Sequence, residues 1–166
     1  MDIYTFIIFL HVAGTILGVG GATIAEVQIY KALKDGKVTA EEGNLLHGTY
    51  GVLRVGMALI IVSAFAMLWY NYTNDTLARL MNEKLWFKEF LFVVLIINAV
   101  AISNRWTPLW LGAATSFTGW WMATALGVAG RLPYSFWTYL AVFIIATLSV
   151  AGILHLIRKF AAKPSN

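Results

Sequence analysis

The chain has 166 residues, of which 60% are hydrophobic and only 12% are charged, and its formal net charge at pH 7 is +4. A soluble globular domain carries about 25% charged residues, so a chain this apolar would lack a polar surface for water. The sequence contains no cysteine, which excludes disulfides, thiolate metal sites, iron–sulfur clusters and thioether-linked haem. The basic residues are explained by membrane orientation, and we expect no nucleic-acid partner.

Five segments are long and apolar enough to cross a bilayer, which takes about 20 mainly apolar residues. In chain order they cover residues 3–32, 44–70, 85–103, 108–129 and 134–157. The first segment lacks the basic leading residues and the cleavage site of a secretory signal, so we expect a retained helix. The sequence therefore predicts an all-α fold, in which residues 1–166 form one five-helix transmembrane bundle in a cell membrane. Short links favour antiparallel neighbours.

The links between the segments carry polar and turn-forming residues. Thr39 followed three residues later by Glu42 resembles a capping box that opens the second helix. Residues 76–84 resemble a short interfacial helix that turns its apolar side chains toward lipid.

The distribution of lysine and arginine predicts how the bundle is oriented, because cytoplasmic loops carry an excess of both. Seven of them fall on one side of the predicted bundle: Lys31, Lys34, Lys37, Arg105, Arg158, Lys159 and Lys163. Four fall on the other side: Arg79, Lys84, Lys88 and Arg131. This bias places the N-terminus outside and the C-terminus in the cytoplasm.

Two segments carry small residues at the four-residue spacing that lets membrane helices approach closely. The residues are Gly14, Gly18 and Ala22 in the first segment, and Gly119, Ala123 and Gly127 in the fourth. The spacing predicts helix contacts along both stripes. A gap made by glycines is also what a flat cofactor needs against a helix backbone.

Ionisable side chains inside a span are costly unless they are paired or hydrated, so each of them is a candidate functional residue. The candidates are His11, Glu26, His47, Arg54, Lys88, Glu89 and His155. Their positions along the spans predict an outer polar layer around His11 and an inner layer that holds the other histidines. In one interpretation Glu26 pairs with Arg54 and joins the first two helices.

Two kinds of cofactor chemistry fit part of this set. A b-type haem takes a neutral histidine nitrogen as ligand and needs room for the macrocycle. The candidate cofactor-binding residues are His11, Gly14, Gly18 and His155. A copper or zinc ion would use His11 as a metal ligand, although the chain has no pair of histidines at helical ligand spacing.

A third chemistry needs no cofactor. Glu26, His47 and Arg54 could form a ligand site or a proton path, as intramembrane ionisable residues do in transporters. The sequence shows no broken helix pair and no inverted repeat of the kind that many transporters contain.

Two short stretches resemble a known group of proteins. Residues 10–14 (LHVAG) and the glycines that follow resemble the first helix of a group of small bacterial inner-membrane proteins. The group includes the membrane-type protoporphyrinogen oxidases and the copper-resistance D-type proteins. Residues 86–88 (WFK) resemble the lysine-containing start of their third helix. In the oxidases the histidine is implicated in haem binding and the lysine in activity, so the resemblance implies a haem ligand at His11 and a catalytic role for Lys88.

The leading hypothesis from the sequence is a haem- or porphyrin-associated membrane protein with a redox or electron-transfer role. The first alternative is a small transporter or small-molecule-binding protein that uses Glu26, His47 and Arg54. The second is a subunit that packs into a homo-oligomer or a larger membrane complex. Whether the protein is an enzyme is left open.

Overall fold

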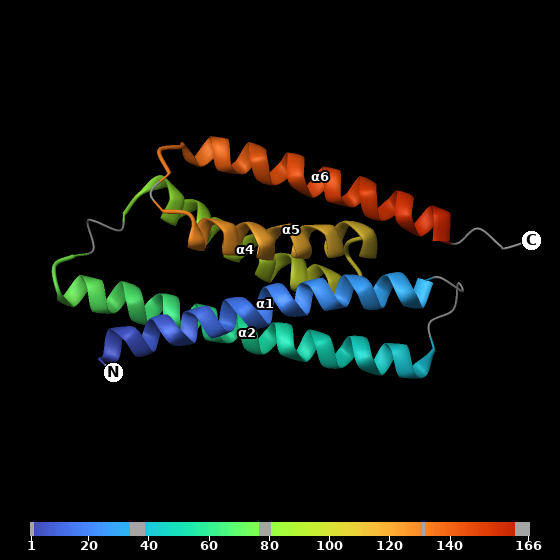
Figure 1. Cartoon of the computed structure of the whole chain (residues 1–166), viewed down its shortest axis with the longest axis horizontal. Coiled ribbons are helices and arrows are strands. Elements are labelled where there is room, and N and C mark those ends of the chain that lie inside the picture. Colours follow the sequence, from blue (N-terminus) through green and yellow to red (C-terminus); the bar gives the residue numbers. More distant parts are fainter. Residues whose placement is uncertain (1, 34–38, 77–80, 131, 162–166) are drawn as a thin grey trace, which may run out of the picture.

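The computed structural model describes residues 2–33, 39–76, 81–130 and 132–161. All the regular secondary structure of these residues is helical, as the sequence predicts. The helices are α1 (Ile3–Leu33), α2 (Ala40–Thr73), α4 (Glu83–Ser103), α5 (Leu109–Val128) and α6 (Phe136–Ala161). Successive helices run in opposite directions, so that α1 begins at one end of the bundle and α6 ends at the other (Figure 1).

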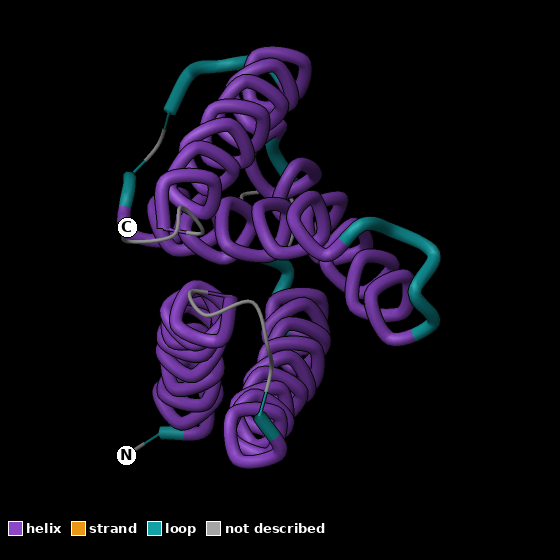
Figure 2. Tube along the Cα trace, turned by 90° about the vertical axis from the view of Figure 1, so that its right-hand side faces the viewer, coloured by secondary structure: helices purple, strands orange, loops and turns teal. Residues whose placement is uncertain are grey.

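The helices form two groups joined through α5. α1 and α2 make a long antiparallel pair, and α5 packs against α1, α4 and α6. Seen along the bundle, the α1–α2 pair lies apart from the other three helices (Figure 2). In the described part of the chain, α2 packs along α1 and makes no comparable contact with the remaining helices. A gap between α2 and α4 is the consequence.

Four helices, α1, α2, α4 and α6, are long and apolar enough to cross a membrane. α5 was also predicted to be a span, but it is not among these four helices. Its glycine, serine and threonine residues lower its mean hydropathy. It is the most enclosed helix, with eight of its 20 residues buried, against four of 34 in α2. A helix sheltered by its neighbours can carry small and weakly polar residues because it presents little surface to lipid.

The predicted capping box at the start of α2 is confirmed. The Thr39 side chain accepts a hydrogen bond from the Glu42 amide, and the Thr39 amide donates to the Glu42 carboxylate at 2.8 Å. The interfacial helix expected over residues 76–84 lies partly outside the described residues. Met81 and Asn82 are not helical, and Asn82 is instead the N-cap that opens α4.

Side chains in the first turn of α4 form hydrogen bonds with the ends of two other helices. The Lys84 ammonium donates hydrogen bonds to the carbonyls of Ala129 and Gly130, at the C-terminal end of α5. The Glu83 carboxylate accepts a hydrogen bond of 3.0 Å from the Phe136 amide, at the N-terminal end of α6. A cation at a helix C-terminus and an anion at a helix N-terminus both match the helix dipole.

The small-residue stripe of α1 makes the contacts that its spacing predicts. A side-chain carbon placed on Gly14 would lie 2.9 Å from the carbonyl oxygen of Gly56 in α2, so the two backbones touch. Gly18 leaves the space that the Trp120 ring of α5 occupies. In α5, Gly119 lies against Leu95, whereas Gly127 is exposed and the contact expected there is wrong.

We expect Gly18→Ala to destabilise the bundle, because the added methyl group would collide with the ring of Trp120, which is 2% exposed and cannot move aside. Overpacking of this kind costs about 1–3 kcal/mol. Gly20→Ala is the matched control, since nothing lies within 4 Å of a carbon added there and alanine raises helix propensity equally at both positions. Thermal unfolding in detergent should show a lower midpoint for Gly18→Ala alone. Equal midpoints for the two variants would contradict the packing argument.

Candidate functional site

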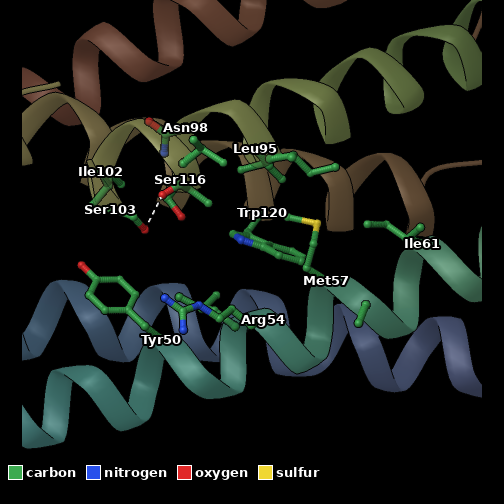
Figure 3. A pocket seen from close by; sticks show the side chains of 15 residues that line it. Tyr50, Arg54, Met57, Ile61, Leu95, Asn98, Ile102, Ser103, Ser116 and Trp120 are labelled. Carbon is green, nitrogen blue, oxygen red and sulfur yellow. Dashed lines mark hydrogen bonds between the residues drawn. The ribbon is translucent and has the colours of Figure 1, made fainter. Parts of the chain in front are cut away.

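A cavity of about 540 Å³ lies in the gap between α2 and α4, with α5 as its floor. Its wall on α2 consists of Tyr50, Leu53, Arg54, Met57, Ala58 and Ile61. Its wall on α4 consists of Leu95, Ile96, Asn98, Ala99, Val100, Ile102 and Ser103, and α5 contributes Ser116 and Trp120. Figure 3 shows the two walls facing each other with the Trp120 ring between them. The cavity exists because α2 leans on α1 and leaves the side of α4 uncovered.

One end of the cavity is polar. Tyr50 and Arg54 are four residues apart on α2, so their side chains lie one turn apart on the same face. Both point into the space between α2 and α4, toward the side where Ser103 and Ser116 lie (Figure 3). The Arg54 guanidinium offers five N–H donors and a fixed positive charge.

Two polar side chains of the opposite wall donate to backbone carbonyls. The Asn98 side-chain nitrogen donates to the Gly112 carbonyl at 2.8 Å and thereby joins α4 to α5. The Ser103 hydroxyl donates to the Ala99 carbonyl at 2.8 Å. At this end of the cavity the donors available to a ligand therefore come mainly from α2.

The other end of the cavity is apolar and rigid. Its surface is formed by Leu53, Met57, Ile61 and Leu95 around the ring of Trp120. The Trp120 ring packs edge-on against Phe92 of α4, with ring centroids 6.4 Å apart. Aliphatic and aromatic side chains of this kind are suited to a hydrocarbon ligand.

His11 belongs to a separate polar site near the start of α1. Its Nδ1 lies 3.0 Å from the Oγ of Ser63 on α2. The Ser63 hydroxyl also lies 2.6 Å from the Leu59 carbonyl oxygen and 3.1 Å from that of Ile60, so its single proton is donated to the backbone. Ser63 Oγ then accepts the hydrogen bond from His11 Nδ1–H, which leaves the lone pair of the neutral imidazole on Nε2.

Lys88, the residue that the family resemblance marks, lies on α4 near His11. It is half-buried and close enough to interact electrostatically with both His11 and Glu89. The structure thus brings Lys88 and its neighbour Glu89 near His11, although 77 positions separate residues 11 and 88. With Ser63 they form one group of polar side chains around His11.

The residues predicted to form the inner polar layer occupy both buried and exposed positions. Glu26 is buried and interacts electrostatically with Tyr50, which lines the cavity. Arg54 lies in the cavity wall, and its pairing with Glu26 stays a prediction. His47 is exposed near the start of α2, and His155 is exposed near the end of α6.

The residues proposed to hold haem do not form a haem pocket. The space beside Gly14 is filled by Gly56 and Ile60 of α2, and the space beside Gly18 is filled by Trp120, so no room is left for a macrocycle on that face. His155 is near the C-terminal end of α6, and that end of α6 lies at the opposite end of the bundle from the start of α1 (Figure 1). Within the described ranges, no three His, Asp or Glu side chains gather closely enough to hold a metal ion.

No family model, curated protein or solved structure matches this chain. The resemblance in the first helix and at the start of the third therefore stays a prediction. The cavity and the polar residues around it are the structural features that bear on function.

Three residues of these sites, Ser63, Ser116 and Trp120, belong to no recognisable sequence motif. Ser63 looks like an ordinary small residue in an apolar span. Its position seven residues after Gly56, on the face that meets α1, is the only signal that it could partner a residue of α1. Ser116 and Trp120 lie on one face of α5, but only the placement of α2 and α4 makes that face the floor of a cavity.

Proposed function

We propose that this chain is a multi-pass membrane protein that binds a hydrophobic or amphiphilic small molecule in the cavity between α2, α4 and α5. The cavity itself carries the proposal, because its volume of about 540 Å³ falls in the range of small-molecule pockets. Its surface is mostly carbon, with a few polar groups gathered at one end. This is the composition that orients a ligand while burying its apolar part.

The ligand would enter from the bilayer. Large apolar side chains cover the outer faces of the helices on both sides of the gap, among them Phe65 of α2 and Ile97 of α4, which are 69% and 62% exposed. Lipid is the solvent that suits such a surface. A molecule dissolved in the membrane could therefore reach the cavity sideways without crossing water.

This proposal keeps part of the site that the sequence suggested for small-molecule binding. Arg54 remains, because it lies in the cavity wall. Glu26 does not line the cavity but interacts electrostatically with Tyr50, which does. His47 does not line the cavity. The ligand site is thus centred on Arg54 and Tyr50.

We expect purified protein to bind cis-parinaric acid or its methyl ester, two fluorescent polyenes that share one hydrocarbon chain. Ala99→Trp should weaken this binding at least tenfold, because the indole would enter the cavity from α4. Ala141→Trp on α6 is the matched control, since Ala141 is exposed and does not line the cavity. Fluorescence titration in lipid nanodiscs gives the affinities. The proposal fails if neither probe binds saturably to the wild type, or if Ala99→Trp binds them as tightly as Ala141→Trp.

We further propose that all five helices cross the membrane, with the N-terminus outside and the C-terminus in the cytoplasm. The antiparallel path of α5 between α4 and α6 supports five crossings, and the excess of lysine and arginine supports the orientation. The cysteine-free chain offers a clean test. Tyr134→Cys should react with a membrane-impermeant maleimide in intact cells, and Glu41→Cys should react only after lysis. The reverse pattern would invert the orientation, and equal labelling of both would exclude the five-span arrangement.

A redox protein with haem at His11 is the second candidate. It is supported by the hydrogen bond to Ser63, which leaves Nε2 as the ligating nitrogen, and by the nearness of Lys88. Because the glycine face of α1 is filled, haem would have to approach from another side. If His11 binds haem, visible spectra of oxidised and reduced protein will show a Soret band that His11→Ala removes and His155→Ala retains. A preparation that stays colourless after haem addition rules this candidate out.

A further inference from the structure

A second, smaller cavity of about 170 Å³ continues the gap between α2 and α4. It is lined by Ile60, Ile61, Ala64, Phe65 and Leu68 of α2 and by Glu89, Phe92, Val93 and Ile96 of α4. Ile61 and Ile96 line both cavities, so these two side chains form the boundary between them. The two cavities are therefore successive parts of one groove along the helices.

From this groove we propose that the ligand is a long-chain carboxylate, with its carboxylate at Arg54 and its hydrocarbon chain passing between Ile61 and Ile96 into the smaller cavity. The inference rests on the proposed function and specifies its ligand. It requires that the groove be long enough for a chain, polar at one end, and charged so that only one direction of binding is favourable.

The dimensions of the groove favour a chain over a compact ring system. Arg54 and Leu68, the last residue of α2 that lines the groove, are 14 residues apart, which corresponds to about 21 Å of helix. The second cavity has about a third of the volume of the first, so a ligand that fills both must be narrow at its far end. A single hydrocarbon chain with a headgroup has that shape.

The charges at the two ends favour one direction. Arg54 provides a cation and, with Tyr50, hydrogen-bond donors at the wide end. Among the described residues that line the narrow end, Glu89 is the one ionisable side chain, and no cation is present to bind a carboxylate there. A carboxylate is thus attracted at Arg54 and finds no cationic partner at the other end.

The headgroup site suits a single negative charge. One guanidinium can bind a carboxylate through two parallel hydrogen bonds. A phosphate monoester carries about 1.5 to 2 negative charges, whereas Arg54 is the single cation among the described residues that line the cavity. The Ser103 hydroxyl and one N–H of the Asn98 amide donate to backbone carbonyls, and neither side chain carries a charge that could balance a second negative charge.

The headgroup is tested by comparing cis-parinaric acid with its methyl ester at alkaline pH, where the acid is ionised. We expect the wild type to bind the acid at least tenfold more tightly than the ester. Arg54→Gln should remove this preference while still binding the ester, and Lys31→Gln, an exposed position outside the cavity, should keep it. Equal affinity of the wild type for acid and ester, or an unchanged preference in Arg54→Gln, overturns the inference but leaves the proposed function standing. If the wild type binds neither the acid nor the ester, the proposed function itself is overturned.

The path of the chain is tested by competition. In the wild type, octadecanoate should displace bound cis-parinaric acid at a lower concentration than dodecanoate does. Ile97→Trp is the matched control and should show the same difference, because the side chain of residue 97 faces outward. Ile96→Trp should lose this dependence on chain length, because its ring would close the passage between the cavities. A length dependence that persists in Ile96→Trp overturns the proposed path. Stronger displacement by octadecyl phosphate than by octadecanoate overturns the choice of a carboxylate.

Discussion

The contact between Gly18 of α1 and Trp120 of α5 is the constraint on which the rest of the structure depends. Trp120 is 2% exposed, and it can lie where it does only because residue 18 has no side chain. Its ring also belongs to a buried cluster with Ile60 of α2 and Phe92 of α4. One side chain therefore connects the α1–α2 pair to the rest of the bundle, and the same ring forms part of the cavity wall.

The bundle is closed on one side and open on the other, and different side chains are responsible. On the α6 side, Phe87 of α4 is fully buried and contacts Phe136, Tyr139 and Phe143 of α6, with ring centroids 5.5 to 6.5 Å apart. Aromatic packing of this density leaves no groove between α4 and α6. On the other side, the touching backbones at Gly14 and Gly56 hold α2 against α1 and away from α4. The cavity is thus a consequence of how tightly α2 is bound to its neighbour in sequence.

The two polar regions of the bundle differ in what they can do. His11 is hydrogen-bonded to Ser63 and lies near Lys88 and Glu89, so this region contains groups that can bind a proton. The space beside Gly14 and Gly18, however, is filled by side chains and backbone of other helices. Arg54 and Tyr50 instead border an open volume. A ligand needs both room and directed polar groups, and only the second region offers both.

The sequence by itself determined the features that depend on neighbours along the chain. Hydropathy and length predicted five helices, each within about four residues of its observed bounds, because helix formation in a nonpolar solvent is decided locally. The Thr39–Glu42 capping box and the α1 contacts at Gly14 and Gly18 were also readable, since each follows from spacing within one segment.

Only the tertiary structure decided where the sites lie. Apolar side chains are interchangeable in a hydropathy pattern, so hydropathy does not distinguish the face of α2 that meets α1 from the face that borders the cavity. Ser63 became the partner of His11, and Trp120 the floor of the cavity, through contacts between helices that are distant along the chain. Of Glu26, His47 and Arg54, it is Arg54 that lines the cavity, because the surroundings of a side chain depend on which neighbouring helix its face meets.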